Sequence, residues 1–414
     1  MHSKKFFQGG LILSVVTAAC LLGAAAYADS PGGDSSPGPV VSFHGFISTT
    51  AFWQDQDFTF GNGQNGEWPV PNTGPKHNLS GMDARSTRAW LDVTGARLGD
   101  GWSAGAHLEA DFFGGFNGTG AYSAQQETPR LRQAFMKLSN AESGSSISIG
   151  QQLNLLFPAD ALPTSLAHVA FPLGFGTGLI GWRFPGVVYS QNLGAATADT
   201  IAWRLDLGAF SGSWNGPGST TNFDTAANVD FRPQLEARLH AQQGNWSGFL
   251  AGHYSSEDLT GVGGNAPAPI TNKINSTAVE IGTAWHPGPW SLVAAAYTGK
   301  GLGPLWGALT QFGAISEHGG YVQGGYKFTP NWGLYAFYAS ARPDKTDVIN
   351  WIGQGSSGLL KNQQYALDLI YTRGPFGFGA EWLHSNLEST TAASAPASIT
   401  TVGNQFSLSA MFNF

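Results

Sequence analysis

The stretch Trp102–Phe112, with the sequence WSAGAHLEADF, decides the fold. Apolar side chains occupy every second position from Trp102 to Phe112, and Ser, Gly, His, Glu and Asp stand between them. A period of two places successive side chains on opposite faces of a β-strand. A water-soluble sandwich would bury the apolar face, whereas a membrane barrel would turn it toward lipid. The number and spacing of further strands must separate these two folds.

The composition of the chain excludes several classes of protein. Of its 414 residues, 13% are aromatic and only 11% are charged, whereas a soluble domain carries about a quarter charged residues. Such a chain is too aromatic for intrinsic disorder. Lys plus Arg number 20 against 27 for Asp plus Glu, so the basic excess of a nucleic-acid-binding protein is missing. After residue 30 no apolar run approaches the ~18 residues that a membrane-spanning helix needs.

The first residues have the pattern of an export signal. Lys4 and Lys5 precede an apolar run, residues 11–26, and Ala26-Tyr27-Ala28 has the small-x-small form of a cleavage site. We therefore expect a cleaved signal peptide over residues 1–28, a flexible Pro/Gly-rich lead-in over 29–40 and a barrel domain over 41–414. The single cysteine, Cys20, lies inside the signal peptide, so the mature chain is expected to contain no disulfide.

The alternating pattern recurs along the whole chain. Short turns rich in Gly, Pro and Asn alternate with long polar loops, an arrangement typical of outer-membrane barrels. The sequence predicts an all-β protein, a transmembrane antiparallel up-and-down β-barrel of about 16 strands. The predicted strands lie near residues 41–53, 85–96, 102–113, 129–139, 146–152, 183–193, 201–210, 232–242, 246–255, 274–285, 290–299, 318–328, 332–341, 362–373, 376–388 and 403–414.

Aromatic residues mark one end of the predicted strands. An aromatic residue follows each of five short turns: Trp102, Trp246, Trp290, Trp332 and Phe376. Aromatic rings favour the headgroup boundary of a bilayer, so this set predicts an interfacial girdle. The last strand alternates up to the terminal Phe414. It is similar to the terminal strand of Gram-negative outer-membrane proteins, which implies that the barrel-assembly machinery recognises Phe414.

Three further motifs resemble those of a known family. RSTRAWLDVTGARLGDGWSAGAHLEADFFGG from Arg85, PRLRQAFMKL from Pro129 and SISIGQQ from Ser146 follow one another in the order found in bacterial trimeric porins. The elements EADFFGG and Arg183-Phe184-Pro185 most resemble the DcaP-like branch. The resemblance implies a homotrimer and an inward-folded third loop, here residues 153–178, whose titratable groups are Asp160 and His168.

Strand alternation and this resemblance together predict the charged lining of a pore. The expected constriction and lumen residues are Arg88, Asp92, Glu109, Asp111, Arg130, Arg132, Asp160, His168 and Arg183. In one interpretation, the arginines form a basic ladder facing Glu109, Asp111 and Asp160, and the resulting field sorts ions. In the other, the charges neutralise one another. The strand 129–139 is ambiguous, because Leu131 and Phe135 compete with Met136 and Leu138 for the outer face.

The resulting functional hypothesis is an outer-membrane porin of a Gram-negative bacterium. It would let small hydrophilic solutes and ions diffuse passively, and its other partners would be outer-membrane lipid, lipopolysaccharide and the assembly machinery. No cofactor, metal site, nucleic-acid partner or catalytic residue is expected, since the chain contains no metal or nucleotide motif. The alternatives are an adhesin or receptor that binds through its long loops, and an outer-membrane hydrolase, which would need Ser and His side by side.

Overall fold

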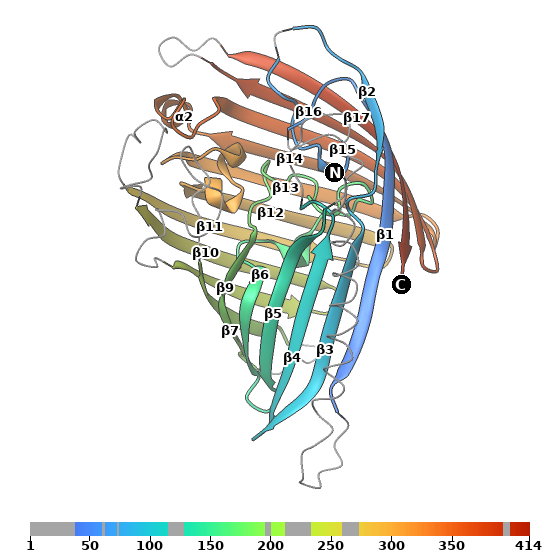
Figure 1. Ribbon diagram of the computed structural model, residues 1–414, viewed down its shortest axis with the longest axis vertical. Coiled ribbons are helices and arrows are strands. Elements are labelled where there is room, and N and C mark those ends of the chain that lie inside the picture. The colour runs from blue at the N-terminus through green and yellow to red at the C-terminus, as the bar shows by residue number, and fades with distance from the viewer. Residues whose placement is uncertain are drawn as a thin grey trace, which may run out of the picture.

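The strands close into an antiparallel barrel, shown by a computed structural model of the protein (Figure 1). The structure describes residues 38–59, 63–72, 74–114, 128–194, 200–211, 233–258, 273–391 and 398–414. The expected signal peptide and most of the lead-in therefore lie outside the described residues. β1 (Val40–Gln54) pairs with β17 (Ile399–Asn413), and this pairing joins the two ends of the sheet.

Sixteen strands cross the wall, as the sequence predicted. The strands between β1 and β17 are β2 (Leu79–Asp83), β3 (Arg88–Gly99), β4 (Trp102–Asp111), β5 (Arg130–Asn140), β6 (Ser145–Leu153), β7 (Arg183–Asn192), β8 (Ala202–Phe210), β9 (Gln234–Gln243), β10 (Trp246–Asp258), β11 (Lys273–Trp285), β12 (Trp290–Lys300), β13 (Ser316–Lys327), β14 (Trp332–Pro343), β15 (Leu359–Arg373) and β16 (Phe376–Ser389). β2 and β3 pair with successive parts of β1, so they form one wall strand interrupted at residues 84–87.

Helices are confined to the connections between strands. The α-helix α2 (Lys345–Asn350) begins at Asp344, whose side chain accepts a hydrogen bond from the backbone N–H of Asp347. Short 3₁₀ helices include η2 (Ala159–Ala161), η4 (Gly303–Leu305) and η5 (Ala308–Thr310). Within the described residues, no helix has the length and apolar character needed to span a membrane.

The two faces of the wall differ in polarity as the alternation predicted. Outward side chains such as Leu250, Ile281 and Leu408 are 51%, 60% and 67% exposed. Inward side chains such as Gln323 and Gln364 are polar and buried. The polar face therefore lines the interior, and the apolar face is the one that meets lipid in a membrane barrel.

A β-bulge in β5 resolves the strand that the sequence left ambiguous. Glu109 pairs with Gln133 and Ala110 pairs with Leu131, so Arg132 is the extra residue. Because the bulge shifts the alternation by one residue, Leu131 and Met136 both face outward, 50% and 61% exposed. Phe135 faces inward, where its ring stacks on His107 with the ring centres 5.2 Å apart.

The first and last strands meet at a close backbone contact. The N–H of Gly45 donates to the carbonyl of Phe414, and the N–H of Phe414 donates to the carbonyl of Gly45. A Cβ at Gly45 would lie 2.6 Å from the backbone carbonyl oxygen of Arg88 on β3 and 2.6 Å from the Phe414 ring. Because the Arg88 carbonyl belongs to the paired strand and cannot move aside, position 45 favours glycine.

Aromatic residues stand at one end of the wall, where the short turns are. The five predicted girdle residues are the first residues of β4, β10, β12, β14 and β16. Three of them pack on aromatic neighbours across the ladder, as Trp332 does on Tyr371 with ring centres 4.9 Å apart.

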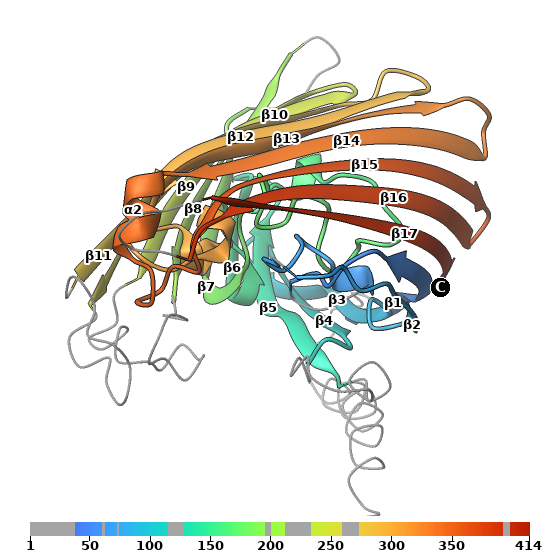
Figure 2. The ribbon, with the colours of Figure 1, turned by 90° about the horizontal axis from the view of Figure 1, so that it is seen from above.

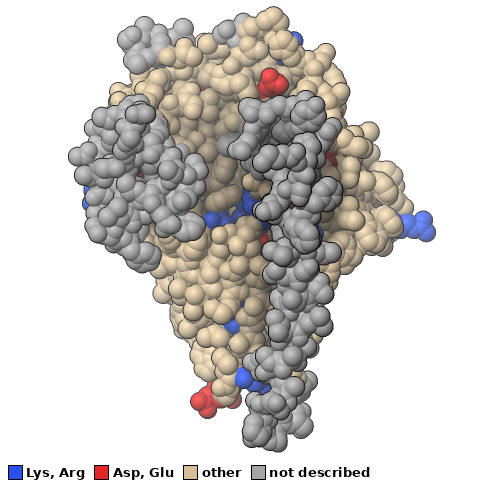
Figure 3. Space-filling model, in the orientation of Figure 1, with Lys and Arg blue, Asp and Glu red and all other residues tan. Residues whose placement is uncertain are grey.

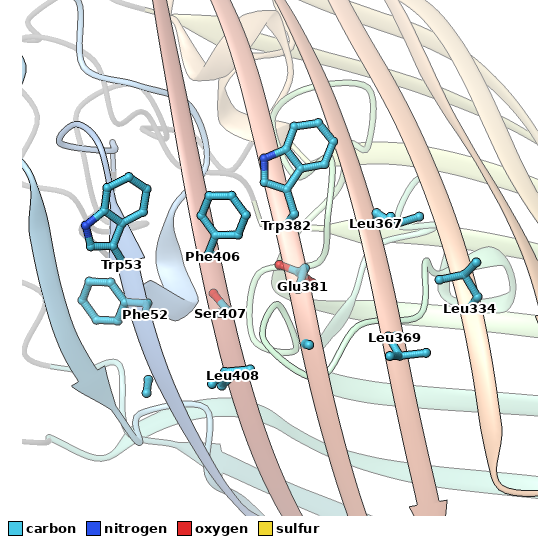
Figure 4. A pocket seen from close by; sticks show the side chains of 12 residues that line it. Phe52, Trp53, Leu334, Leu367, Leu369, Glu381, Trp382, Phe406, Ser407 and Leu408 are labelled. Carbon is cyan, nitrogen blue, oxygen red and sulfur yellow. The ribbon is translucent and has the colours of Figure 1, made fainter.

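Further along the outer wall, small residues leave an apolar groove of about 560 Å³ beside Leu367, Trp382 and Leu408 (Figure 4).

Substituting Leu367→Arg tests which face of the wall meets lipid. Leu367 is 44% exposed on the outer side of β15. An arginine near the bilayer midplane is expected to lower the free energy of unfolding by about 2–4 kcal/mol, measured by denaturant unfolding in lipid vesicles. Leu367→Ala is the control, because it removes the same side chain without adding charge. Equal stability of the two variants would contradict a lipid-facing position.

Candidate pore constriction

The connection between β6 and β7 lies inside the barrel. We call its residues 154–182 the constriction loop; it crosses the interior between the walls (Figure 2). Near its middle, the N–H of Thr164 donates to Gln323 Oε1 on β13 at 2.7 Å. Further along, the N–H of Gly174 donates to Gln364 Oε1 on β15 at 2.7 Å. The buried polar side chains of the far wall thus pair with the backbone of this loop.

Glycine allows the loop to approach the wall closely. Gly178 has a φ of +97°, in the left-handed region that favours glycine. A Cβ at Gly178 would lie 2.3 Å from the carbonyl oxygen of Gly320 on β13. The path of the loop is therefore set by backbone geometry as well as by its polar contacts.

Three histidine–carboxylate pairs fasten the constriction loop to the barrel wall. Two lie between loop and wall directly: His168 Nδ1 is 2.7 Å from Glu381 Oε1 on β16, and His240 Nδ1 on β9 is 3.1 Å from Asp160 Oδ2. In the third, Glu236 on β9 contacts His253 at 2.9 Å and accepts hydrogen bonds from the loop at Asn154 and Leu155.

The Asp160 attachment is sensitive to pH in a defined direction. The hydrogen bond from His240 holds the pKa of the Asp160 carboxyl below its ordinary value; partial burial opposes this effect and the charge of Arg238 reinforces it. Because the folded-state pKa is lowered, the stabilisation is present above the ordinary pKa of the carboxyl. It is lost only as the pH falls through the lower folded-state value.

Six of the predicted lumen residues form one charged cluster on the wall. We call it the arginine cluster: Arg88 on β3, Glu109 and Asp111 on β4, Arg130 and Arg132 on β5, and Arg183 on β7. Asp111 accepts hydrogen bonds from Arg130 at 2.6 and 2.9 Å and from Arg132 at 2.8 Å. Glu109 pairs with Arg132 and lies 3.7 Å from Arg88. Lys or Arg side chains are visible inside the central hollow (Figure 3).

The arginine cluster carries an excess of positive charge. The guanidinium groups of Arg88, Arg130 and Arg132 share the two carboxylates, and Arg183 adds a fourth positive charge, so the cluster has two more positive than negative groups. Arg183 forms no ion pair within the described residues, and its guanidinium lies 3.9 Å from the ring centre of Trp182. The side chains of Arg88 and Arg130 remain 14% and 20% exposed.

Three predicted site residues lie away from this cluster. Asp92 pairs with His107 at 2.7 Å, next to the cluster on the same wall. Asp160 was expected to face the arginines, but it pairs instead with Arg238 at 3.2 Å and with His240 on β9. His168 is bound to Glu381. The reason is topological: the loop crosses the barrel, so its titratable groups meet β9 and β16 rather than β3–β7.

An aromatic cluster at the arginines was not expected from the sequence. Trp182 lies 5.0 Å from Trp306 and 5.8 Å from Phe171, measured between ring centres. The guanidinium of Arg130 lies 5.2 Å from the ring centre of Phe171 and 5.7 Å from that of Trp182. Only the aromatic content of the loops could have suggested this cluster, since its members come from two loops far apart in sequence.

A carboxylate, a His and a Ser are hydrogen-bonded in that order on the wall. His253 Nδ1 lies 2.9 Å from Glu236 Oε1 and its Nε2 lies 3.1 Å from Ser255 Oγ. This is the hydrogen-bond order of a catalytic triad. However, His253 and Ser255 are buried, and Glu236 also binds the backbone of the constriction loop. The arrangement therefore holds a loop in place and offers a substrate no access.

Comparison with solved structures shows the fold of known outer-membrane channels. DcaP of Acinetobacter baumannii is 20% identical, with 92% of this chain and 99% of that chain covered and a TM-score of 0.67. The trimer form of OmpT from Vibrio cholerae is 13% identical, with 91% and 100% covered and a TM-score of 0.56. OmpF of Salmonella typhi, in complex with daunomycin, is 11% identical, with 90% and 97% covered and a TM-score of 0.53.

Comparison of the sequence with families agrees with the fold. A search of curated proteins gives no match. The Gram-negative porin family, in contrast, matches residues 15–346, which is most of the chain. The family predicted from the motifs is therefore confirmed: the chain belongs to the Gram-negative porin family and is a channel protein of the outer membrane.

Proposed function

We propose that this porin conducts small hydrophilic solutes and ions passively and prefers anions. The observation that carries the proposal is the arginine cluster, which contains four guanidinium groups and two carboxylates, with three of the guanidinium groups paired to those carboxylates. Charged rings in a narrow, low-dielectric channel select ions by sign. Of the two interpretations of the wall charges, an ion-sorting field is favoured over mutual neutralisation.

The constriction loop is the element that we propose to narrow this pathway. Its backbone carbonyl at Val169 accepts a hydrogen bond from Arg88 at 3.2 Å, so loop and arginine cluster lie side by side. Polar cavities of about 510 and 470 Å³ lie toward the short-turn end; the first is lined by Asp160, Arg204 and His240, the second by Ser103, Lys137 and Ser190. These polar linings support a hydrated lumen.

We infer that the protein is not an enzyme. Among the described residues, the arrangement that favours a hydrolase is the chain Glu236–His253–Ser255, and all three side chains are buried. An acyl transfer would need the serine oxygen accessible to a carbonyl group. The loop attachment explains these hydrogen bonds without any chemistry.

We propose further that the protein is exported by its signal peptide and assembled into a homotrimer. The aromatic first residues of the strands would mark one headgroup boundary, and lipopolysaccharide would surround the other end. Phe414, 47% exposed at the end of the chain, would be the group that the assembly machinery recognises. The outward wall of β3–β6 carries Ala, Leu, Val, Met and Ile between its ends, a smooth aliphatic face that would suit packing of one copy against another.

The ion preference can be measured as the reversal potential of the refolded protein in a planar bilayer under a KCl gradient. We expect the reversal potential of the wild type to have the sign that a preference for chloride over potassium gives. The double variant Arg88→Gln, Arg183→Gln removes the two excess positive charges and should move the reversal potential toward zero. Lys76→Gln, on an exposed loop, is the matched control. A cation preference in the wild type would refute the proposal.

Releasing the constriction loop should change the current. Leaving a buried hydrogen-bonding group without its partner costs about 1–3 kcal/mol, so His168→Ala should free the loop from Glu381. We expect larger current noise and a larger mean conductance in single-channel recordings. His286→Ala is the control, because His286 is exposed at a short turn. Identical recordings from both variants would show that the loop does not limit the current.

Cysteine cross-linking can locate the subunit interface. The described residues contain no cysteine, so a single introduced cysteine reports its own position. Met136→Cys on β5 and Ile281→Cys on β11 have nearly equal exposure at the parent residues, 61% and 60%. With a short bis-maleimide in membranes, Met136→Cys should give cross-linked species and Ile281→Cys should not. Only monomers from both variants would contradict packing through β3–β6.

A further inference from the structure

A further cavity lies at the long-loop end of the barrel. It has a volume of about 700 Å³ and is lined by residues of the segments 58–59, 68–71, 303–312 and 357–359. Its largest lining side chains are Phe58, Trp68, Trp306, Leu309, Phe312 and Leu359. None of the residues that line it is charged. It is therefore distinct from the arginine cluster in both position and chemistry.

The backbone that shapes this cavity is strained. Trp306, Leu309 and Thr310 have φ angles of 57°, 48° and 57°, and all three line the cavity. Bulky residues rarely adopt this left-handed conformation, and such strain persists where the surrounding structure imposes it. Here Gln311 imposes it: its amide donates to the carbonyl of Leu359 at 2.7 Å and accepts from the N–H of Leu359 at 2.8 Å.

One hydroxyl group in the cavity wall has no partner. Thr310 Oγ1 is buried and forms no hydrogen bond in the described part of the chain. Buried polar atoms are nearly always paired, so an exception of this kind needs an explanation. This oxygen is closed off from solvent as it stands, so a ligand with a hydrogen-bonding oxygen would pair with it after rotation of the Thr310 side chain about χ1.

Packed aromatic rings connect the wall of the cavity to the constriction loop. The ring of Trp306 forms part of the cavity wall, and its centre lies 4.8 Å from the ring centre of Phe175 and 5.0 Å from that of Trp182. Trp182 in turn contacts Arg183. A solute that binds in the cavity would therefore stand directly before the charged part of the pathway.

We propose that this cavity is a binding site for the ring of a neutral, ring-bearing organic solute, such as an aryl ether or aryl glycoside. The volume lies within the range of about 300–1,000 Å³ that is usual for small-molecule pockets. Aromatic faces stack on rings, while the uncharged lining would leave an ion without compensation. Thr59, Thr310 and Ser357 supply the polar side chains of the lining.

Calorimetric titration of the detergent-solubilised protein tests the site with two matched probes. Phenyl β-glucoside carries the ring and a glycosidic oxygen, whereas methyl β-glucoside lacks the ring. We expect saturable binding of the phenyl compound and none of the methyl compound. Val70→Trp, at an exposed position of the cavity rim, should fill the mouth and weaken phenyl binding by about tenfold or more.

Two further variants complete the test. Thr310→Val keeps the shape and removes the hydroxyl, and should weaken phenyl binding by about three- to tenfold. Val41→Trp, at an exposed valine of β1 far from the cavity, should leave it unchanged. Equal binding of both glucosides, or wild-type affinity in Val70→Trp, would overturn the proposal. Because calorimetry does not depend on conduction, a protein that fails to conduct could still be found to bind.

Discussion

Pairing of every backbone N–H and C=O inside hydrocarbon is the constraint on which this structure depends. A strand edge facing lipid would leave a row of unpaired groups, each costing several kcal/mol, so the sheet has to close. The closing contact is the reciprocal pair of hydrogen bonds between Gly45 and Phe414. The closed antiparallel sheet and its even number of wall strands follow from this requirement.

The same requirement acts a second time inside the barrel. The inward face carries many buried polar side chains, and the long connections enter the interior to meet them. Gln364 binds the constriction loop at Gly174 and the first long loop at Glu67. Glu381 binds both Ser165 and His168 of the constriction loop. The loops therefore fill part of the interior, and they bring the rings of Trp182 and Trp306 beside the arginine cluster.

The sequence was a good guide wherever structure depends on near neighbours. Strand positions, short turns and the inward direction of Glu109 and Asp111 follow from a period of two, and the structure confirms them. The partners of the constriction loop could not be predicted in this way. The attachment of His168 to Glu381 joins residues 213 positions apart, and no local pattern encodes that distance. The placement of Asp160 was wrong for the same reason. The bulge at Arg132 is an intermediate case. The sequence shows that Leu131 and Met136 compete for the outer face, but it does not show that a bulge lets both side chains face outward.

That bulge has a consequence for how this protein can evolve. Even-numbered residues face inward before Arg132, and odd-numbered residues face inward after it. Leu131 and Met136 can therefore share the outer face although they are five positions apart. Point substitutions on either side leave both patterns intact. Losing Arg132 itself would restore a regular ladder and would leave Leu131, Phe135 and Met136 on their present faces. Losing or gaining a residue elsewhere in the strand would turn the side chains beyond it to the opposite side of the wall. The segment should therefore tolerate a change in length at the bulge and resist one elsewhere.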